Sequence, residues 1–134
     1  MGNCINVFDR EGNLISQGTH GMTCCIYANE IIKQYNPNFD MFRLNDVNEQ
    51  MKSAYDNGSP EDIIILLIFM NDESEFEESD LPDFEKAIAK LDPGNRIHQN
   101  IKMHLEAYMR LIKEFKYINT KYVGCFSAMT VVGG

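Results

Sequence analysis

The feature that most constrains this fold is an apolar run that ends in an acidic run. Residues 63–69 are all Ile, Leu or Phe, and six of the nine residues over 72–80 are Asp or Glu. An apolar run without alternation is typical of a strand buried on both faces. Unpaired carboxylates are too costly to bury, so the acidic run must stay in water. The sequence therefore predicts a buried central strand over 62–70 that leads into an acidic surface loop.

The rest of the chain supplies three more strands and four helices. A β-hairpin is expected over 4–9 and 13–17, because Gly12 provides the positive φ that such a turn needs. Apolar residues recur at spacings of three and four, and Asn, Pro and Gly mark the breaks between elements. These signals predict helices that end near residue 35 and that cover about 45–56, 81–91 and 97–117, followed by a strand over 122–132.

The resulting element order is ββααβααβ. It predicts one α+β domain over 1–134, with a mixed four-stranded sheet packed against about four helices. The two-helix connection between 62–70 and 122–132 permits these two strands to pair in parallel.

Charge and cysteine usage limit the partners and the compartment. The net charge of −8 comes from 20 acids and 12 scattered bases, which disfavours direct contact with nucleic acid or anionic membrane and favours a basic protein partner. No apolar run reaches the roughly 20 residues of a membrane span. Without a signal peptide, the four cysteines are expected as reduced thiols in a cytoplasmic protein. Lipidation at Gly2 or Cys4 is not expected, because residue 6 is Asn.

The acidic segment is the first candidate site. We expect residues 72–85 to dock a basic protein, with Phe76 as an apolar anchor among the charges. The segment lacks the Gly of a calcium-binding loop, so no metal is assigned to it, and the alternative interpretation is a solvated linker. The expected binding residues are Asp72, Glu73, Glu75, Phe76, Glu77, Glu78 and Asp80.

A second candidate lies where the first helix begins. A thiol at a helix N-terminus can have a lowered pKa, so Cys24 or Cys25 would be the nucleophile, and Gln17 would donate to an oxyanion. His20 completes this alternative set of catalytic residues. Gln17-Gly18, Gly21 and Cys24 resemble the motif of papain-like cysteine peptidases over about nine residues, and the resemblance implies a hydrolase or transferase. The spacing from Gln17 to Cys24 is one residue longer than in that family, and no later strand carries a His. The competing interpretation is that both cysteines are core residues.

The remaining candidates are weaker patterns. His20 and Cys24 are four residues apart, but two ligands do not complete a zinc site, and His20 is expected in a surface loop. No cofactor motif occurs. The terminal Gly133-Gly134 is interpreted as a frayed end.

We therefore expect a small acidic cytoplasmic protein-binding module. In composition alone, it resembles toxin-neutralising immunity proteins and phage-encoded inhibitors. The alternatives are the cysteine-dependent enzyme, or a small-ligand sensor with its pocket at the C-terminal end of 62–70.

Overall fold

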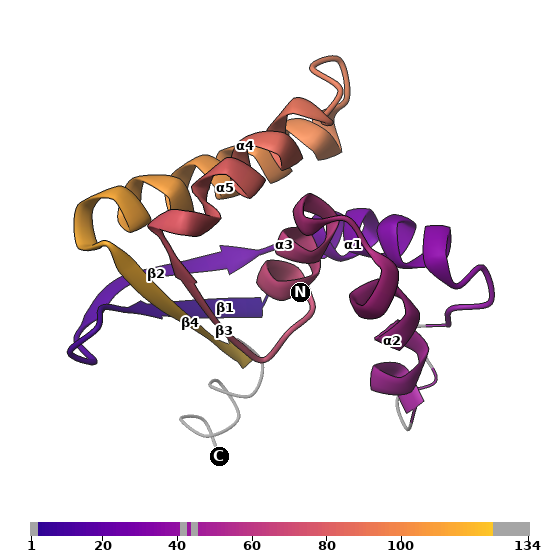
Figure 1. Cartoon of the computed structure of the whole chain (residues 1–134), viewed down its shortest axis with the longest axis horizontal. Coiled ribbons are helices and arrows are strands. Elements are labelled where there is room, and N and C mark those ends of the chain that lie inside the picture. Colours follow the sequence, from indigo (N-terminus) through magenta and orange to yellow (C-terminus); the bar gives the residue numbers. More distant parts are fainter. Residues whose placement is uncertain (1–2, 41–42, 44–45, 125–134) are drawn as a thin grey trace.

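The structure is a computed structural model, and it describes residues 3–40, 43 and 46–124. Within these residues one four-stranded antiparallel sheet, with strand order β2-β1-β4-β3, combines with five α-helices in an α+β domain. Figure 1 shows α4 and α5 as a pair along one side of the sheet, and α1, α2 and α3 grouped near one end of it. The elements are β1 (Asn3–Phe8), β2 (Leu14–His20), α1 (Met22–Tyr35), α2 (Val47–Asn57), α3 (Pro60–Phe69), β3 (Glu73–Glu77), α4 (Leu81–Ala89), α5 (Arg96–Phe115) and β4 (Tyr117–Gly124).

The predicted hairpin and four predicted helices are confirmed, with ends shifted by a few residues. In the hairpin turn, Gly12 has φ of +85°, and the Asp9 carboxylate accepts from the main-chain N–H of Glu11 and Asn13 at 3.0 and 2.8 Å. Helix α5 begins where the Asn95 side chain accepts from two main-chain N–H groups. Local polar signals therefore place these elements correctly.

The prediction of a central strand over 62–70 is wrong, because this segment forms helix α3. Ser59 caps the helix by accepting from the N–H of Asp62 at 3.3 Å, Pro60 occupies the first turn, and two acids follow it. These are ordinary signals of a helix start. The burial prediction is confirmed, since Ile65, Leu66 and Ile68 are each at most 1% exposed. A helix that is apolar all round is a buried helix, and α3 lies against α1 and α4.

The prediction of a mixed sheet is also wrong, because all the strand pairs described are antiparallel. Once the 60–69 segment is a helix, β4 has no parallel partner there, and it lies between β1 and β3 instead. Strand β4 starts at Tyr117, five residues earlier than predicted, directly after Lys116 turns the chain with φ of 66°. Residues 125–132 of the predicted last strand lie outside the described residues.

The two faces of the sheet differ in their burial. Ile5, Val7, Phe76 and Ile118 project to one face and are at most 2% exposed. This face packs on the side where α4 and α5 lie (Figure 1). The second face carries Asn6, Phe8, Gln17, Tyr117, Lys121, Glu73, Glu75 and Glu77, all exposed or half-buried, together with the buried Asn119. Alternation along each strand therefore separates the core from a polar surface.

The cysteines differ from the prediction in one respect. Cys24 and Cys25 have free thiols, as predicted. Cys4 is disulfide-bonded, so the prediction of four reduced thiols is wrong for this residue. Gly2, Cys125, Gly133 and Gly134 lie outside the described residues.

Candidate functional site

The acidic segment forms an edge strand and a short 3-10 turn, where the sequence predicted a loop. Strand β3 has the sequence Glu-Ser-Glu-Phe-Glu, and its side chains alternate strictly between exposed glutamates and the buried Ser74 and Phe76. This alternation has the period of a strand with one buried face. It was the signal that could have identified β3, and the density of charge obscured it. We call Asp72, Glu73, Glu75, Glu77, Glu78 and Asp80 the acidic strip.

Phe76 is not available as the surface anchor that the sequence predicted. Its side chain is 1% exposed, and its ring meets the Phe84 ring of α4 edge to face at 5.4 Å between centroids. The phenylalanine therefore attaches the edge strand to the core. The contact surface of the strip consists of carboxylates alone.

Three carboxylates of the strip, those of Glu73, Glu75 and Glu78, each have a polar or charged side-chain partner. The hydroxyl of Tyr117 donates to Glu75 at 2.7 Å, and the Asn119 amide donates to Glu73 at 3.2 Å. The Glu75 carboxylate raises the pKa of Tyr117 to about 12. Glu78 pairs with Lys116 at 3.4 Å, but both side chains are more than half exposed, so the pair adds little stability. These contacts position the carboxylates without neutralising most of them.

Two basic residues on the same face lie over aromatic rings. The Arg10 guanidinium is 4.4 Å from the centre of the Tyr117 ring, and the Lys121 ammonium is 5.3 Å from that of Phe8. Lys121 is the cross-strand partner of Glu73, but their charged groups form no ion pair in the described structure. The negative field of the strip is therefore only partly offset by its neighbours.

The main chain of β3 is paired on one side only. The N–H of Tyr122 donates to the C=O of Asp72 at 2.8 Å, so alternate residues from Asp72 onward direct their peptide groups toward β4. The peptide groups of Glu73, Glu75 and Glu77 then point away from the sheet. The Asn71 amide donates to the C=O of Glu73 at 2.7 Å, and Asp80 accepts from the N–H of Glu77 at 2.9 Å. For the N–H and C=O of Glu75, no partner exists within the described residues.

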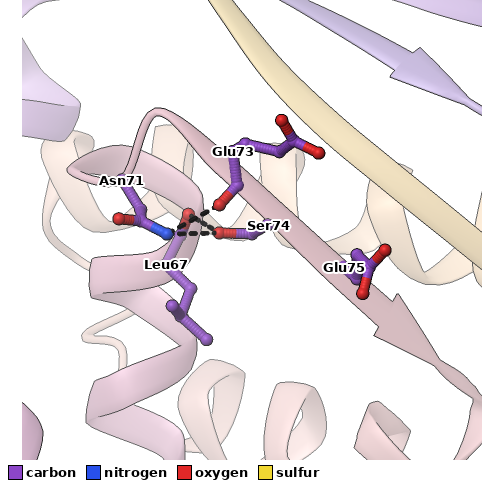
Figure 2. Close-up of a pocket in the computed structure, with 5 residues that line it drawn as sticks. All are labelled: Leu67, Asn71, Glu73, Ser74 and Glu75. Atoms are coloured by element: carbon purple, nitrogen blue, oxygen red, sulfur yellow. Dashed lines mark hydrogen bonds between the residues drawn. The ribbon is translucent and has the colours of Figure 1, made fainter.

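A hollow lies beside this edge, between the C-terminal end of α3 and β3. Its volume is about 540 Å³, and Figure 2 shows its lining residues. Ser74 donates to the C=O of Leu67 at 2.9 Å, and Asn71 donates to the Ser74 hydroxyl at 3.1 Å. These hydrogen bonds join the C-terminal end of α3 to β3, and the bonded residues line the hollow. The lining residues are Leu67, Asn71, Glu73, Ser74 and Glu75. Leu67 belongs to the apolar run over 63–69, and the hollow lies at the end of that run, where the small-ligand alternative expected a pocket. The sequence did not single out Asn71, because it belongs to no motif.

The residues of the cysteine alternative do not converge on an activated thiol. Cys24 is fully buried, and burial raises the pKa of its thiol to about 11. Burial also raises the pKa of Cys25. Gln17 is exposed on the second face of the sheet, where its amide donates to Asn6 at 3.1 Å. Cys24 is therefore a core residue, as the competing interpretation has it, whereas Cys25 is only half-buried.

His20 is buried at the end of β2, and not in a surface loop as predicted. It is 3% exposed, with its Nε2 3.0 Å from the Tyr108 hydroxyl and its Nδ1 3.3 Å from that of Tyr122. The His104 ring lies 4.5 Å away in an edge contact, and a cavity of about 160 Å³ adjoins both imidazoles. Burial, followed by the neighbouring His104, lowers the pKa of His20 to about 3. The imidazole is therefore neutral at pH 7 and connects the sheet to α5.

Iodoacetamide at pH 7 is expected to alkylate Cys24 at least about a hundredfold more slowly than a free thiol. A pKa near 11 leaves only about one thiol in ten thousand ionised, against a few per cent for free cysteine. Peptide mass mapping of the Cys25→Ala variant would measure the rate at Cys24, with the urea-unfolded protein as control. Rapid labelling of the folded protein would instead indicate an activated nucleophile.

Metal-binding geometry, membrane-spanning helices and similarity to known proteins assign no function to the chain. In the part of the chain that is described, no group of three or more His, Cys, Asp or Glu side chains is arranged to hold a metal ion. No helix there has both the length and the hydropathy to cross a bilayer. No family model matches the sequence, and neither a curated protein nor a solved structure matches it significantly.

Proposed function

We propose that this protein is a binding module that uses the acidic strip to hold and mask a basic protein surface. The observation that carries the proposal is the regular display of Glu73, Glu75 and Glu77 on one face of an edge strand. Carboxylates held on a strand have fixed spacing. Binding a basic partner to them therefore costs less conformational entropy than binding the same partner to a flexible acidic loop. Fixed charge of one sign also steers a partner of the opposite sign during encounter.

The position of the strip also supports this function. Its carboxylates lie at the sheet edge, and their half-buried neighbours on β4 and β1 include Tyr117 and Phe8, each with a cation over its ring. A partner would therefore meet carboxylates first and an aromatic, polar surface next to them. Aromatic side chains beside charges are common where protein interfaces gain affinity. An inhibitor-like or immunity-like role fits such a surface, because covering a basic site requires charge and shape but no chemistry of its own.

The triple variant Glu73→Gln, Glu75→Gln, Glu77→Gln is expected to bind a lysine-rich peptide about threefold to a hundredfold more weakly, since it removes three exposed charge contacts that contribute about 0.2–1 kcal/mol each. Calorimetry or fluorescence anisotropy at 50 and 150 mM NaCl would measure it, and the salt dependence should become shallower. The glutamine amides keep the shape and the hydrogen-bond acceptors, so stability should change by no more than about 0.5 kcal/mol.

The matched control removes three exposed glutamates elsewhere, with Glu30→Gln, Glu49→Gln, Glu106→Gln. This control has the same net charge as the strip variant, so it separates local recognition from overall charge. The proposal requires the control to bind like the natural protein. Equal loss in both variants would show that only net charge matters, and the strip would then have no special role.

A further inference from the structure

The outer edge of β3 offers main-chain hydrogen bonds as well as charge. One group at each neighbouring position is already bonded: the C=O of Glu73 accepts from Asn71, and the N–H of Glu77 donates to Asp80. Between them, the N–H and C=O of Glu75 face away from β4 and have no partner in residues 3–40, 43 and 46–124. An unpaired strand edge is a template for another extended segment. The hollow of about 540 Å³ lies along this same edge, where such a segment would need space.

We propose that the partner docks as an extended segment that pairs with the outer edge of β3, centred on Glu75. The inference rests on the proposed function and specifies its geometry. Strand addition obtains affinity from main-chain hydrogen bonds and specificity from side chains at alternate positions. Here the main-chain contribution comes from the peptide groups of Glu75, and the side-chain contribution comes from the glutamates on either side of it.

The register of β3 defines the chemistry of the partner segment. Side chains directly opposite one another across paired strands lie about 5 Å apart. Residues of the segment that face Glu73, Glu75 and Glu77 should therefore be Lys or Arg, at every second position. The residues between them face the side of Ser74 and the hollow, where the Leu67 side chain also lies (Figure 2). Small or β-branched residues such as Thr or Val suit these positions.

The same charges exclude a second copy of this chain from the edge. Pairing of β3 with another β3 would place glutamates against glutamates, in a protein with net charge of −8. Like charges directly opposite one another destabilise a strand pair. The glutamates that protect the edge from self-association thus select a basic strand in place of an acidic or neutral one.

Backbone methylation of a probe peptide tests this inference. The probe is a blocked heptapeptide in which lysine and threonine alternate, beginning and ending with lysine. One derivative carries N-methyl groups on the amides of the two central lysines, and the other carries them on the amides of two threonines. The extra methyl groups remove one set of N–H donors and leave the charge unchanged.

The N–H groups of a paired strand alternate in direction, so the two methylated derivatives should differ in affinity. In a paired strand only every second residue directs its N–H toward the neighbour, so one derivative should bind at least about tenfold more weakly while the other retains the affinity of the unmodified peptide. Loss with the methylated lysines indicates antiparallel pairing opposite Glu75, and loss with the methylated threonines indicates parallel pairing. On binding, the amide of Glu75 should also exchange its hydrogen more slowly, by about tenfold or more.

The remaining outcomes overturn the inference. If both derivatives bind as well as the unmodified peptide, or both lose affinity equally, the segment does not pair with the edge. If the natural protein binds both derivatives and the strip variant binds neither, the proposed function survives and only the strand pairing fails. If the unmodified peptide does not bind at all, the proposed function and the strand pairing fail together.

Discussion

Replacing Phe76 by alanine is expected to lower the free energy of unfolding by about 3–5 kcal/mol, the usual range for removing a buried phenylalanine. The side chain is 1% exposed, and its ring lies edge to face with that of Phe84 at an interplanar angle of 81°. Its removal leaves a cavity between the edge strand and α4, and the mostly exposed residues around it on β3 cannot refill this space. Urea unfolding followed by circular dichroism would measure the loss.

The matched control lies on α4, one residue from Phe84. Glu85→Ala changes an exposed side chain and is expected to alter stability by no more than about 0.5 kcal/mol. The Phe84→Ala variant, combined with Phe76→Ala in a double-mutant cycle, should reveal a coupling of about 0.5–1.5 kcal/mol between the two rings. A stable Phe76→Ala variant would mean that the phenylalanine is at the surface, and the register of β3 would then be wrong.

Acidification below about pH 6.5 is expected to destabilise the protein through His20. Its pKa is about 3 in the folded chain, because of burial, and about 6.5 in the unfolded chain. Between these values the unfolded state binds a proton that the folded state does not, so stability falls as the pH falls. The contribution is fully present above pH 6.5 and is lost at up to about 1.4 kcal/mol per pH unit down to about pH 3.

The His20→Gln variant isolates this contribution. Glutamine can still donate and accept toward Tyr108 and Tyr122, but it does not titrate. Urea unfolding of both proteins at intervals between pH 7 and pH 4.5 would separate the slope from any constant loss of stability in the variant. The carboxylates and His104 are common to both proteins, so their titration contributes to both slopes. Identical slopes would show that His20 is protonated as easily in the folded state as in the unfolded chain.

The hairpin and most helices were predictable because their signals are local. The Asp9 carboxylate and Gly12 define the turn, and the Asn95 side chain defines the start of α5. Each signal acts within a few residues, through a hydrogen bond or a backbone angle that the rest of the fold does not change. The spacing of apolar residues then marks which face of each helix is buried.

The segment 60–69 was predictable in burial but not in secondary structure. A continuous apolar run fits a buried strand and a buried helix equally well. Its β-branched residues favoured a strand, whereas Ser59, Pro60 and the two acids after them favoured a helix. The helical signals lie at the start of the segment and determine its secondary structure. The prediction of a mixed sheet is wrong for the same reason, because the parallel pair was expected between a strand over 62–70 and the last strand.

The candidate site was only partly predictable. The sequence located its carboxylates, since a dense acidic run must be exposed. The hollow beside β3 combines Leu67 and Asn71 of the α3 end with the glutamates of the strand, and no local pattern connects these residues. The unpaired peptide groups of Glu75 depend on β3 being the last strand in the order β2-β1-β4-β3.

The sequence by itself determined which segments are buried and which carry charge, because desolvation acts on each side chain wherever the chain goes. Only the tertiary structure decided that the acidic segment is an edge strand with Phe76 inside and Glu75 free to pair. That outcome depends on β4 inserting between β1 and β3, and strand order is set by contacts between residues more than forty positions apart, which local propensities do not encode.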